Sequence, residues 1–229
     1  MEERHPAMPG SPVFWLALKF VVLGPLLRLM FRPRVTGLEH IPPTGGAIVA
    51  ANHVSFLDPL LLPLVVPRRR VMFLTKMKYI DKPFLHWFLR GAGVIPVDPG
   101  QPGASGDTVT AGVQAVSQGR LVGIFPEGTR SRDGLLHPGK TGVARIAIQA
   151  GVPVIPVGIA GTDHAFPRGA RLPRPRSVQI KFGPPILLDA PVGTVPDPPV
   201  IRRSTDQVMA AIQALSGQQS VTGRVSPAA

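Results

Sequence analysis

The chain has 229 residues, enough for one globular domain with a sizeable core. Its hydrophobic content of 44% excludes the disordered and collagen-like classes, and the absence of cysteine excludes disulfides, thiolate catalysis and cysteine-based zinc sites. The lack of cysteine also favours the reducing cytoplasm. The net charge of +12 predicts an anionic partner such as nucleic acid, anionic lipid or a phosphorylated metabolite.

The first predicted element in chain order is an apolar segment, residues 13–31, which follows a polar and proline-rich start. It is interrupted by Lys19, Gly24, Pro25 and Arg28. A bilayer-spanning helix needs ~20 apolar residues with few charges, so we expect two short helices that lie in the membrane interface as an anchor. A single spanning helix is the alternative. A cleaved signal peptide is disfavoured because the start is acidic and no small-residue cleavage site follows.

Beyond this segment, apolar runs alternate with segments of helical period. Six runs suit buried strands: 46–52, 70–76, 93–98, 121–127, 152–159 and 178–183. A helix is predicted over 141–150, and a proline-rich run leads into a last helix. The pattern predicts an α/β fold with a mixed, largely parallel sheet flanked by helices. We divide the chain into a tail with membrane-associating helices, 1–34, and a domain, 35–229. Ligands of such sheets bind in loops beyond the carboxyl ends of the strands.

Basic residues border strongly apolar ones in several segments, including 67–73 and 76–90. This arrangement suits a surface resting on an anionic bilayer better than one that follows a nucleic-acid backbone. Trp and Tyr together number only three, which leaves little for base stacking. The alternative is an ordinary solvated basic surface.

The loop after the first predicted strand contains His53 and Asp58, five residues apart. Pro59 is a good first helical residue and Asp58 a good N-cap, so we expect the helix to begin there and His53 to fold back against Asp58. A carboxylate on one imidazole nitrogen leaves the other free to take a proton. No Ser or Cys is set up as a nucleophile, so His53 would activate a hydroxyl of the substrate. The alternative is structural, with Asp58 only a cap and His53 a loop residue.

The loop after the fourth predicted strand, residues 125–134, is polar and contains two arginines. Arg130 presents donors in a planar fork that matches the oxygens of a phosphate. Glu127 is placed to hold the loop or the arginine. The alternative is a surface turn with an incidental ion pair.

Residues 134–141, "GLLHPGKT", fit the nucleotide-binding pattern G-x-x-x-x-G-K-[ST]. A working phosphate loop follows a strand directly and cradles the phosphate with consecutive backbone N–H groups. Here "GTRSRD" separates the strand from Gly134, and Pro138 removes one donor. The sequence therefore disfavours a nucleotide-binding protein.

Four segments occur in order over residues 46–160: "NHVSFLD", "GVIPVD", "FPEGTRS" and "VPVIPV". They resemble the glycerolipid acyltransferase (PlsC-like) family, whose best-known members are the 1-acylglycerol-3-phosphate acyltransferases. The first matches the family block Asn-His-x-x-x-x-Asp, and "FPEGTRS" matches its block without a mismatch. The second block usually ends in an Arg, and Pro99 stands there in this chain. Because the family associates that arginine with the acceptor, its absence leaves the acceptor's head group open.

The resemblance implies that His53 and Asp58 are catalytic. His53, oriented by Asp58, removes the proton from the free hydroxyl of a lysophospholipid. The oxygen then attacks the thioester of acyl-coenzyme A or acyl-carrier protein, without a covalent enzyme intermediate. The acceptor phosphate is assigned to Arg130, Lys76, Glu127, Gly128 and Thr129.

The resemblance further implies formation of phosphatidic acid in phospholipid biosynthesis. No cofactor or metal is expected, because the acyl thioester is a co-substrate. The expected partners are the lysophospholipid and acyl thioester substrates and an anionic membrane surface at the cytoplasmic face of the cell membrane, with acyl-carrier protein as one candidate donor and no nucleic acid. The alternatives are the same chemistry on another lysophospholipid or glycerol-3-phosphate, and a non-catalytic nucleotide- or membrane-binding protein.

Overall fold

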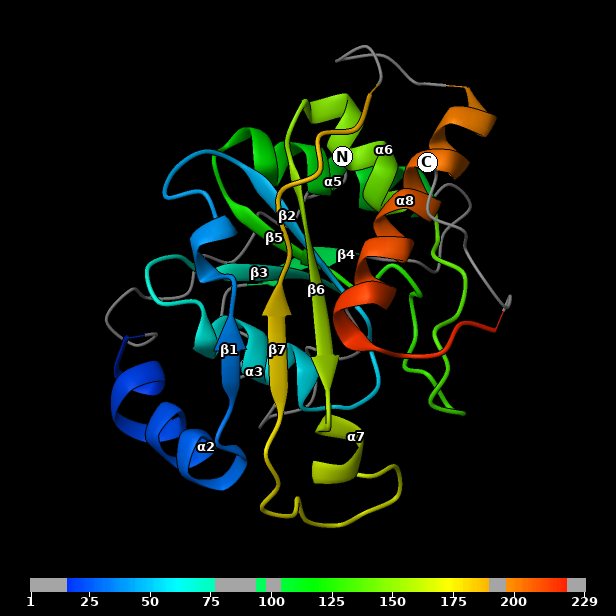
Figure 1. The fold of residues 1–229 in the computed structure, drawn as a ribbon. Coiled ribbons are helices and arrows are strands. Elements are labelled where there is room, and N and C mark those ends of the chain that lie inside the picture. Colours follow the sequence, from blue (N-terminus) through cyan, green and yellow to red (C-terminus); the bar gives the residue numbers. More distant parts are fainter. Residues whose placement is uncertain (1–15, 77–93, 98–103, 190–196, 222–229) are drawn as a thin grey trace.

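The computed structural model describes residues 16–76, 94–97, 104–189 and 197–221. Within these ranges the strands form one sheet in the order β1-β7-β6-β2-β5-β3-β4 (Figure 1). The strands are β1 Arg34–Thr36, β2 Ala47–Ala51, β3 Val71–Lys76, β4 Val94–Val97, β5 Leu121–Ile124, β6 Val154–Ala160 and β7 Gln179–Phe182. Neighbouring strands are parallel except β6 and β7, which are antiparallel. The prediction of a mixed, largely parallel sheet is confirmed.

Each of the six predicted apolar runs forms a strand. The sequence did not predict β1, which is only three residues long and lacks an apolar run. Its backbone pairs with β7, from Arg34 opposite Gln179 to Thr36 opposite Lys181. A strand this short is held by its partner, so its own residues carry no recognisable strand pattern.

Helices cover both faces of the sheet, which makes three layers (Figure 1). The helical elements are η1 Leu18–Val22, α2 Leu23–Phe31, η2 Leu38–His40, α3 Asp58–Val65, α5 Ala104–Ser117, α6 Gly142–Ala150, α7 Thr162–Ala165 and α8 Pro198–Ser216. Strand β2 contributes to both cores: Ala47, Val49 and Ala51 pack with α2 and α3, whereas Ile48 and Ala50 pack with α5, α6 and α8. Because successive side chains alternate in direction, a strand covered on both faces reads as a continuous apolar run.

The N-terminal helical segment passes without a break from η1, a π-helical turn, into α2. Gly24 and Pro25 lie inside α2, so the expected break between two short helices is wrong: the π-helical turn is followed directly by the α-helix. A side-chain carbon on Gly24 would lie 1.7 Å from the carbonyl oxygen of Lys19, so the wide turn accepts only glycine there. Among the described residues, no helix has both the length and the apolar character needed to cross a bilayer.

Lys19 fastens this segment to the domain. Its side chain is 2% exposed, and its Nζ donates a hydrogen bond to the carbonyl of Val66 at the end of α3. The last carbonyls of a helix lack helical partners and attract cations. Burial and the nearby charge of Arg28 lower the pKa of Lys19 to about 8. Leu27 and Phe31 share a core with α3, so the segment packs on the domain; the division of the chain at residue 34 stays a prediction.

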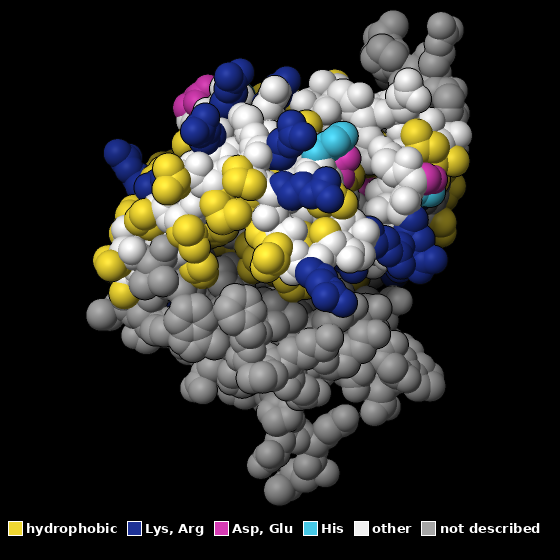
Figure 2. All heavy atoms as spheres, turned by 90° about the horizontal axis from the view of Figure 1, so that it is seen from below, with side chains coloured by type: hydrophobic (Ala, Val, Ile, Leu, Met, Phe, Trp, Pro, Cys, Tyr) yellow, Lys and Arg dark blue, Asp and Glu magenta, His cyan; other side chains and the backbone are white. Residues whose placement is uncertain are grey.

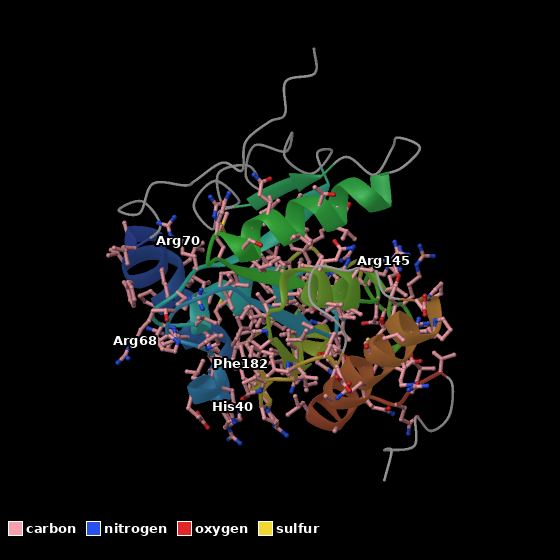
Figure 3. The ribbon with its side chains drawn as sticks, turned by 90° about the horizontal axis from the view of Figure 1, so that it is seen from above. His40, Arg68, Arg70, Arg145 and Phe182 are labelled. Carbon is pink, nitrogen blue, oxygen red and sulfur yellow. The ribbon has the colours of Figure 1, made fainter. Side chains whose placement is uncertain are left out.

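The turn between β1 and β2 is fixed against β7. His40 points toward Phe182 (Figure 3), and its Nδ1 lies 2.9 Å from the Phe182 carbonyl oxygen, to which it donates. Gly37 has φ +79, and a side-chain carbon there would lie 1.9 Å from the same carbonyl oxygen. The close approach of the two backbones therefore requires glycine at this position.

Candidate active site

Three neighbouring strands, β5, β2 and β6, run parallel and end at the same edge of the sheet. His53 follows β2, the segment 125–134 follows β5, and Thr162 follows β6. Strand β3, which ends at Lys76, pairs in parallel with β5. The topology thus gathers the predicted site residues at the carboxyl edge, where α/β sheets place their ligands.

His53 and Asp58 meet as the sequence predicts. The Nδ1 of His53 lies 2.9 Å from Oδ2 of Asp58. The Asp58 side chain is fully buried, and that of His53 is 15% exposed. Because the carboxylate accepts the hydrogen bond from Nδ1, Nε2 is the nitrogen left to take a proton from a substrate.

Asp58 accepts three further hydrogen bonds. The amides of Val54 and Ser55 donate to Oδ2 at 2.8 and 2.7 Å, and the hydroxyl of Thr162 donates to Oδ1 at 2.6 Å. Helix α3 begins at Asp58 with Leu57 as its N-cap and no side-chain cap. The predicted start of the helix is confirmed, but the prediction that Asp58 caps it is wrong, because Oδ2 binds the preceding loop and Oδ1 binds Thr162. Four donors hold the carboxylate rigidly beneath the imidazole.

The imidazole of His53 is also fixed from its flat side. It stacks on the ring of Phe125, with centroids 4.1 Å apart and planes inclined by 17°. Phe125 in turn stacks on Phe73 of β3 at 5.1 Å. The backbone carbonyl of His53 accepts a hydrogen bond of 2.7 Å from the amide of Ser131. Ring and backbone are thus both held, which leaves little freedom for the base to turn away from Asp58.

Glu127 lies between two loops of the site. Its carboxylate accepts hydrogen bonds from the amides of His53 at 3.0 Å and His137 at 3.1 Å, and the residue is 5% exposed. Burial raises the pKa of Glu127, and the two amide hydrogen bonds oppose that rise. The carboxylate therefore positions the backbone of the base. The prediction that Glu127 meets the acceptor phosphate stays a prediction.

Gly128, Thr129 and Arg130 are exposed in the same loop. The amide of Gly128 donates to the carbonyl of Phe125 at 2.9 Å, and the part of Gly128 in phosphate binding stays a prediction. Arg130 lines a hollow beside the base, together with Val54, Ser55, Ser131, Phe166 and Arg168. The guanidinium predicted to bind phosphate is therefore next to residues 52–57, which connect β2 to α3 and are here called the catalytic loop after the role predicted for His53. The role of Thr129 stays a prediction.

Two positions named from the sequence, Lys76 and Pro99, lie partly or wholly outside the described residues. The backbone of Lys76 is the last residue of β3, whereas its side chain lies outside the described residues. Pro99 also lies outside them. The role of Lys76 in phosphate binding and the consequence of Pro99 stay predictions.

The segment "GLLHPGKT" does not form a nucleotide cradle. Its amides are already donated in different directions: Leu135 to Asp133, Leu136 to Gln219, His137 to Glu127 and Lys140 to Pro126. Pro138 has no N–H. The side chain of Lys140 instead lies against Gly128. A Cβ atom added to Gly128 would lie 2.9 Å from Nζ of Lys140. The segment therefore continues the loop after β5, and these contacts count against the nucleotide-binding alternative.

The sequence analysis missed two residues that build the site. Asn52 is buried and bridges β2 to β6: its Nδ2 donates to the carbonyl of Ile159 at 2.9 Å, and its Oδ1 accepts from the amide of Ile159 at 2.8 Å. Its place beside His53 was a signal, because it opens the Asn-His-x-x-x-x-Asp block. Thr162, which binds Asp58, gave no sequence signal.

Two other His–Asp pairs show why burial matters. His137 with Asp133 and His164 with Asp163 have similar distances, 2.9 and 3.0 Å, but all four side chains are at least 41% exposed. Hydrogen bonds lower the pKa of Asp133 to about 2, and the one from His137 contributes most.

Within the described ranges no cluster of three or more His, Asp or Glu is placed to hold a metal. A larger hollow of about 570 Å³ lies away from the base, between α2, β1 and the end of α3.

Comparisons with known proteins match the part of the chain that contains the site. The acyltransferase family model matches residues 32–160, which include both loops of the site. A chloroplastic 1-acyl-sn-glycerol-3-phosphate acyltransferase of Brassica napus is 34% identical over 61% of this chain and 40% of its own length. That of Borreliella burgdorferi is 32% identical over 58% of this chain and 52% of its own length. The chain thus spans about half or less of these curated relatives.

The fold agrees with a solved structure, the 1-acyl-sn-glycerophosphate (LPA) acyltransferase PlsC of Thermotoga maritima. The similarity covers 94% of this chain and 90% of that protein, with a TM-score of 0.65 and 25% sequence identity. The resemblance drawn from the four sequence blocks is confirmed. The chain belongs to the acyltransferase family.

Proposed function

We propose that the protein transfers an acyl group from an acyl thioester to the free hydroxyl of 1-acylglycerol-3-phosphate, which forms phosphatidic acid. The observation that carries the proposal is the buried Asp58 bound to Nδ1 of His53 at the carboxyl edge of the sheet. The names of the curated relatives and of the similar PlsC structure support this acceptor.

The reaction needs one proton acceptor beside the hydroxyl. Nε2 of His53 takes the hydroxyl proton while the oxygen attacks the thioester carbonyl. The carbon–sulfur bond then breaks, and His53 returns the proton to the leaving thiolate. The chain has no cysteine, and the nearby hydroxyl of Ser55 donates to the carbonyl of Phe166 at 3.1 Å. A direct transfer without a covalent enzyme intermediate is therefore the chemistry that these residues support.

Arg130 binds the phosphate of the acceptor, whereas His53 binds its hydroxyl. It lines the hollow beside Val54 and Ser55, the residues that follow the base in the chain. A guanidinium binds phosphate oxygens as a planar fork, and we assign Lys76, the last residue of β3, to the same phosphate. Holding the phosphate there would set the glycerol hydroxyl against Nε2, so much of the rate gain is positioning.

Acceptor identity is tested with purified protein, acyl-coenzyme A and a panel of acceptors. The panel comprises lysophosphatidate, glycerol-3-phosphate, lysophosphatidylcholine and lysophosphatidylglycerol. We expect the highest kcat/KM with lysophosphatidate. No turnover of lysophosphatidate, with turnover of another member, would move the protein to that acceptor. Replacing acyl-coenzyme A with acyl-carrier protein thioester in the same assay identifies the donor.

We further propose that the protein rests on an anionic membrane through α2 and η1, at the cytoplasmic face. Large apolar side chains of this segment are exposed, including Leu26 at 51%, Leu29 at 73% and Val21 at 73%. Figure 2 shows hydrophobic side chains gathered at the left, on the side where α2 lies in Figure 1, with Lys and Arg side chains around them and across the rest of the described surface. Apolar groups with adjacent cations suit the interface of an anionic bilayer.

The membrane proposal is tested with Leu26→Asp and Leu29→Asp. We expect each to weaken flotation with phosphatidylglycerol-containing vesicles, because a carboxylate would enter the apolar interface. Leu187→Asp is the matched control, since Leu187 is 73% exposed, as Leu29 is, but lies outside the N-terminal segment. Equal vesicle binding by the wild type and all three variants would refute the proposal.

A further inference from the structure

The segment 166–177, here called the arginine loop, lies beyond the part of the chain that the family model matches. It contains four arginines, Arg168, Arg171, Arg174 and Arg176, all exposed. Leu172 in the same loop is 77% exposed. The loop follows α7 and lies at the bottom of Figure 1, on the face that Figure 2 shows. A loop with this composition faces an anionic environment.

The start of the arginine loop is fastened to the catalytic loop. The carbonyl of Phe166 accepts a hydrogen bond of 3.1 Å from the hydroxyl of Ser55. The amide of Arg174 donates to the carbonyl of Ala165 at 2.7 Å, and this contact folds the loop back on α7. Residues near Phe166 are therefore held beside the catalytic loop.

Arg168 and Arg130 line one hollow from two different loops. Val54, Ser55, Ser131 and Phe166 complete its lining, and none of these residues is acidic. Within the described part of the chain, neither guanidinium makes a hydrogen bond or ion pair with a protein group. Two cations at one hollow repel each other unless an anion lies between them.

We propose that Arg168 is a second phosphate-binding residue, which holds the acceptor phosphate together with Arg130. The proposal rests on the function proposed above, because it takes the phosphate of a lysophospholipid as the anion. Each guanidinium would donate to different phosphate oxygens, with Arg130 fixed by the loop after β5 and Arg168 by the loop after α7. The pair therefore selects acceptors with an exposed phosphate monoester over acceptors without one.

The experiment compares Arg168→Ala, Arg168→Lys and Arg171→Ala in steady-state acyl transfer. Arg171 is a matched control, since it is an exposed arginine of the same loop that does not line the hollow. We expect Arg168→Ala to raise KM for lysophosphatidate about tenfold to a hundredfold, the loss of one charge-assisted contact. We expect kcat to change little, and Arg168→Lys to restore part of the affinity. Arg171→Ala should remain within about twofold of wild type.

A neutral acceptor separates phosphate binding from other effects. With monoacylglycerol presented in the same mixed micelles, Arg168→Ala and wild type should have equal rates. Equal losses for Arg168→Ala and Arg171→Ala would show that the loop acts only through general attraction to the membrane, and would overturn the proposal. An equal loss with both acceptors would also overturn it, because the residue would then be structural.

Binding in the absence of turnover distinguishes failure of this proposal from failure of the proposed function. His53→Ala and His53→Ala/Arg168→Ala are titrated with phosphatidylcholine vesicles that contain lysophosphatidate or, separately, phosphatidylglycerol. We expect the second change to weaken binding to the lysophosphatidate vesicles alone. If wild type acylates another lysophospholipid but this difference persists, the proposed acceptor is wrong and the phosphate site stands. If the difference is absent, the phosphate site is refuted whatever the acceptor.

Discussion

Asp58 fixes the orientation and the tautomer of the His53 imidazole. Three of its four hydrogen bonds come from groups other than the histidine, so the carboxylate is held in place independently of the imidazole. The carboxylate in turn keeps the proton of the neutral ring on Nδ1 and stabilises the imidazolium that forms when Nε2 takes a proton. The exposed pairs at His137 and His164 lack this burial.

Asp58→Asn tests the carboxylate. An amide in its place supplies one oxygen acceptor rather than two and no negative charge, so it cannot hold the same contacts or stabilise the imidazolium. We expect kcat to fall about 10²-fold to 10⁴-fold, with a small change in KM. Asp206→Asn is the control, because Asp206 pairs with Arg202 on the exposed face of α8 and should leave the rate unchanged. A near-normal kcat for Asp58→Asn would contradict the role given to this residue.

Thr162→Val tests the remote support of the base. It removes the hydroxyl that binds Oδ1 of Asp58 and keeps the shape of the side chain. We expect a loss of about 1–3 kcal/mol in the free energy of unfolding and a lower kcat. Thr205→Val is the matched control, since Thr205 is also fully buried and donates to the carbonyl of Ile201 within α8. It should lose similar stability and keep kcat; equal kcat in both variants would count against positioning by Thr162.

At the scale of elements, the sequence predicted what local patterns determine. The apolar runs predicted β2 to β7, and the polar segment after β2 predicted a loop with His53 that leads to a helix starting at Asp58. Strand β1 depends on its pairing with β7, so its three residues carry no pattern of their own. The same limit applies to single residues: Thr162 reaches Asp58 across 104 residues, and the stacking of Phe125 on His53 depends on β5 lying beside β2.

The burial of Lys19 in the N-terminal segment predicts that the stability of the protein depends on pH. Burial, with the charge of Arg28, lowers the pKa of Lys19 from 10.5 to about 8. Between these values the unfolded chain binds more protons than the folded chain, so the stability of the protein rises with pH across that window. We expect wild type to gain about 1–3 kcal/mol relative to Lys19→Met between pH 7.5 and pH 10. Urea unfolding of both proteins measures this; a constant difference, or a loss, would contradict the burial of a charged Lys19.

Gly24→Ala tests the turn between η1 and α2. The added carbon would meet a backbone atom, the Lys19 carbonyl oxygen, which cannot move aside as a side chain can. We expect a loss of about 1–3 kcal/mol and weaker protection of α2 amides in hydrogen exchange. Gly142→Ala, at the start of α6 with no atom within 4 Å of the added carbon, should be neutral or stabilising. Unchanged α2 protection in Gly24→Ala would show that the junction has another geometry.

At the scale of the whole molecule, the site and the proposed membrane face are related by the fold. Strands β5, β2 and β6 direct their loops to one edge of the sheet. Helix α2 packs beside α3, the helix that begins at Asp58. If α2 rests on a bilayer as proposed, an acceptor held by its phosphate near His53 would keep its acyl chain in that bilayer. This relation depends on tertiary packing, which is why the sequence predicted both parts but not their arrangement.

The most direct test of the account measures acyl transfer from acyl-coenzyme A to lysophosphatidate by wild type, His53→Ala and His164→Ala. His164 is the control because it also contacts an aspartate through Nδ1 but is 79% exposed. We predict that His53→Ala loses at least about 10²-fold in kcat at saturating substrates while still binding anionic vesicles, and that His164→Ala keeps the wild-type rate. Comparable rates for wild type and His53→Ala would contradict the assignment of His53 as the base.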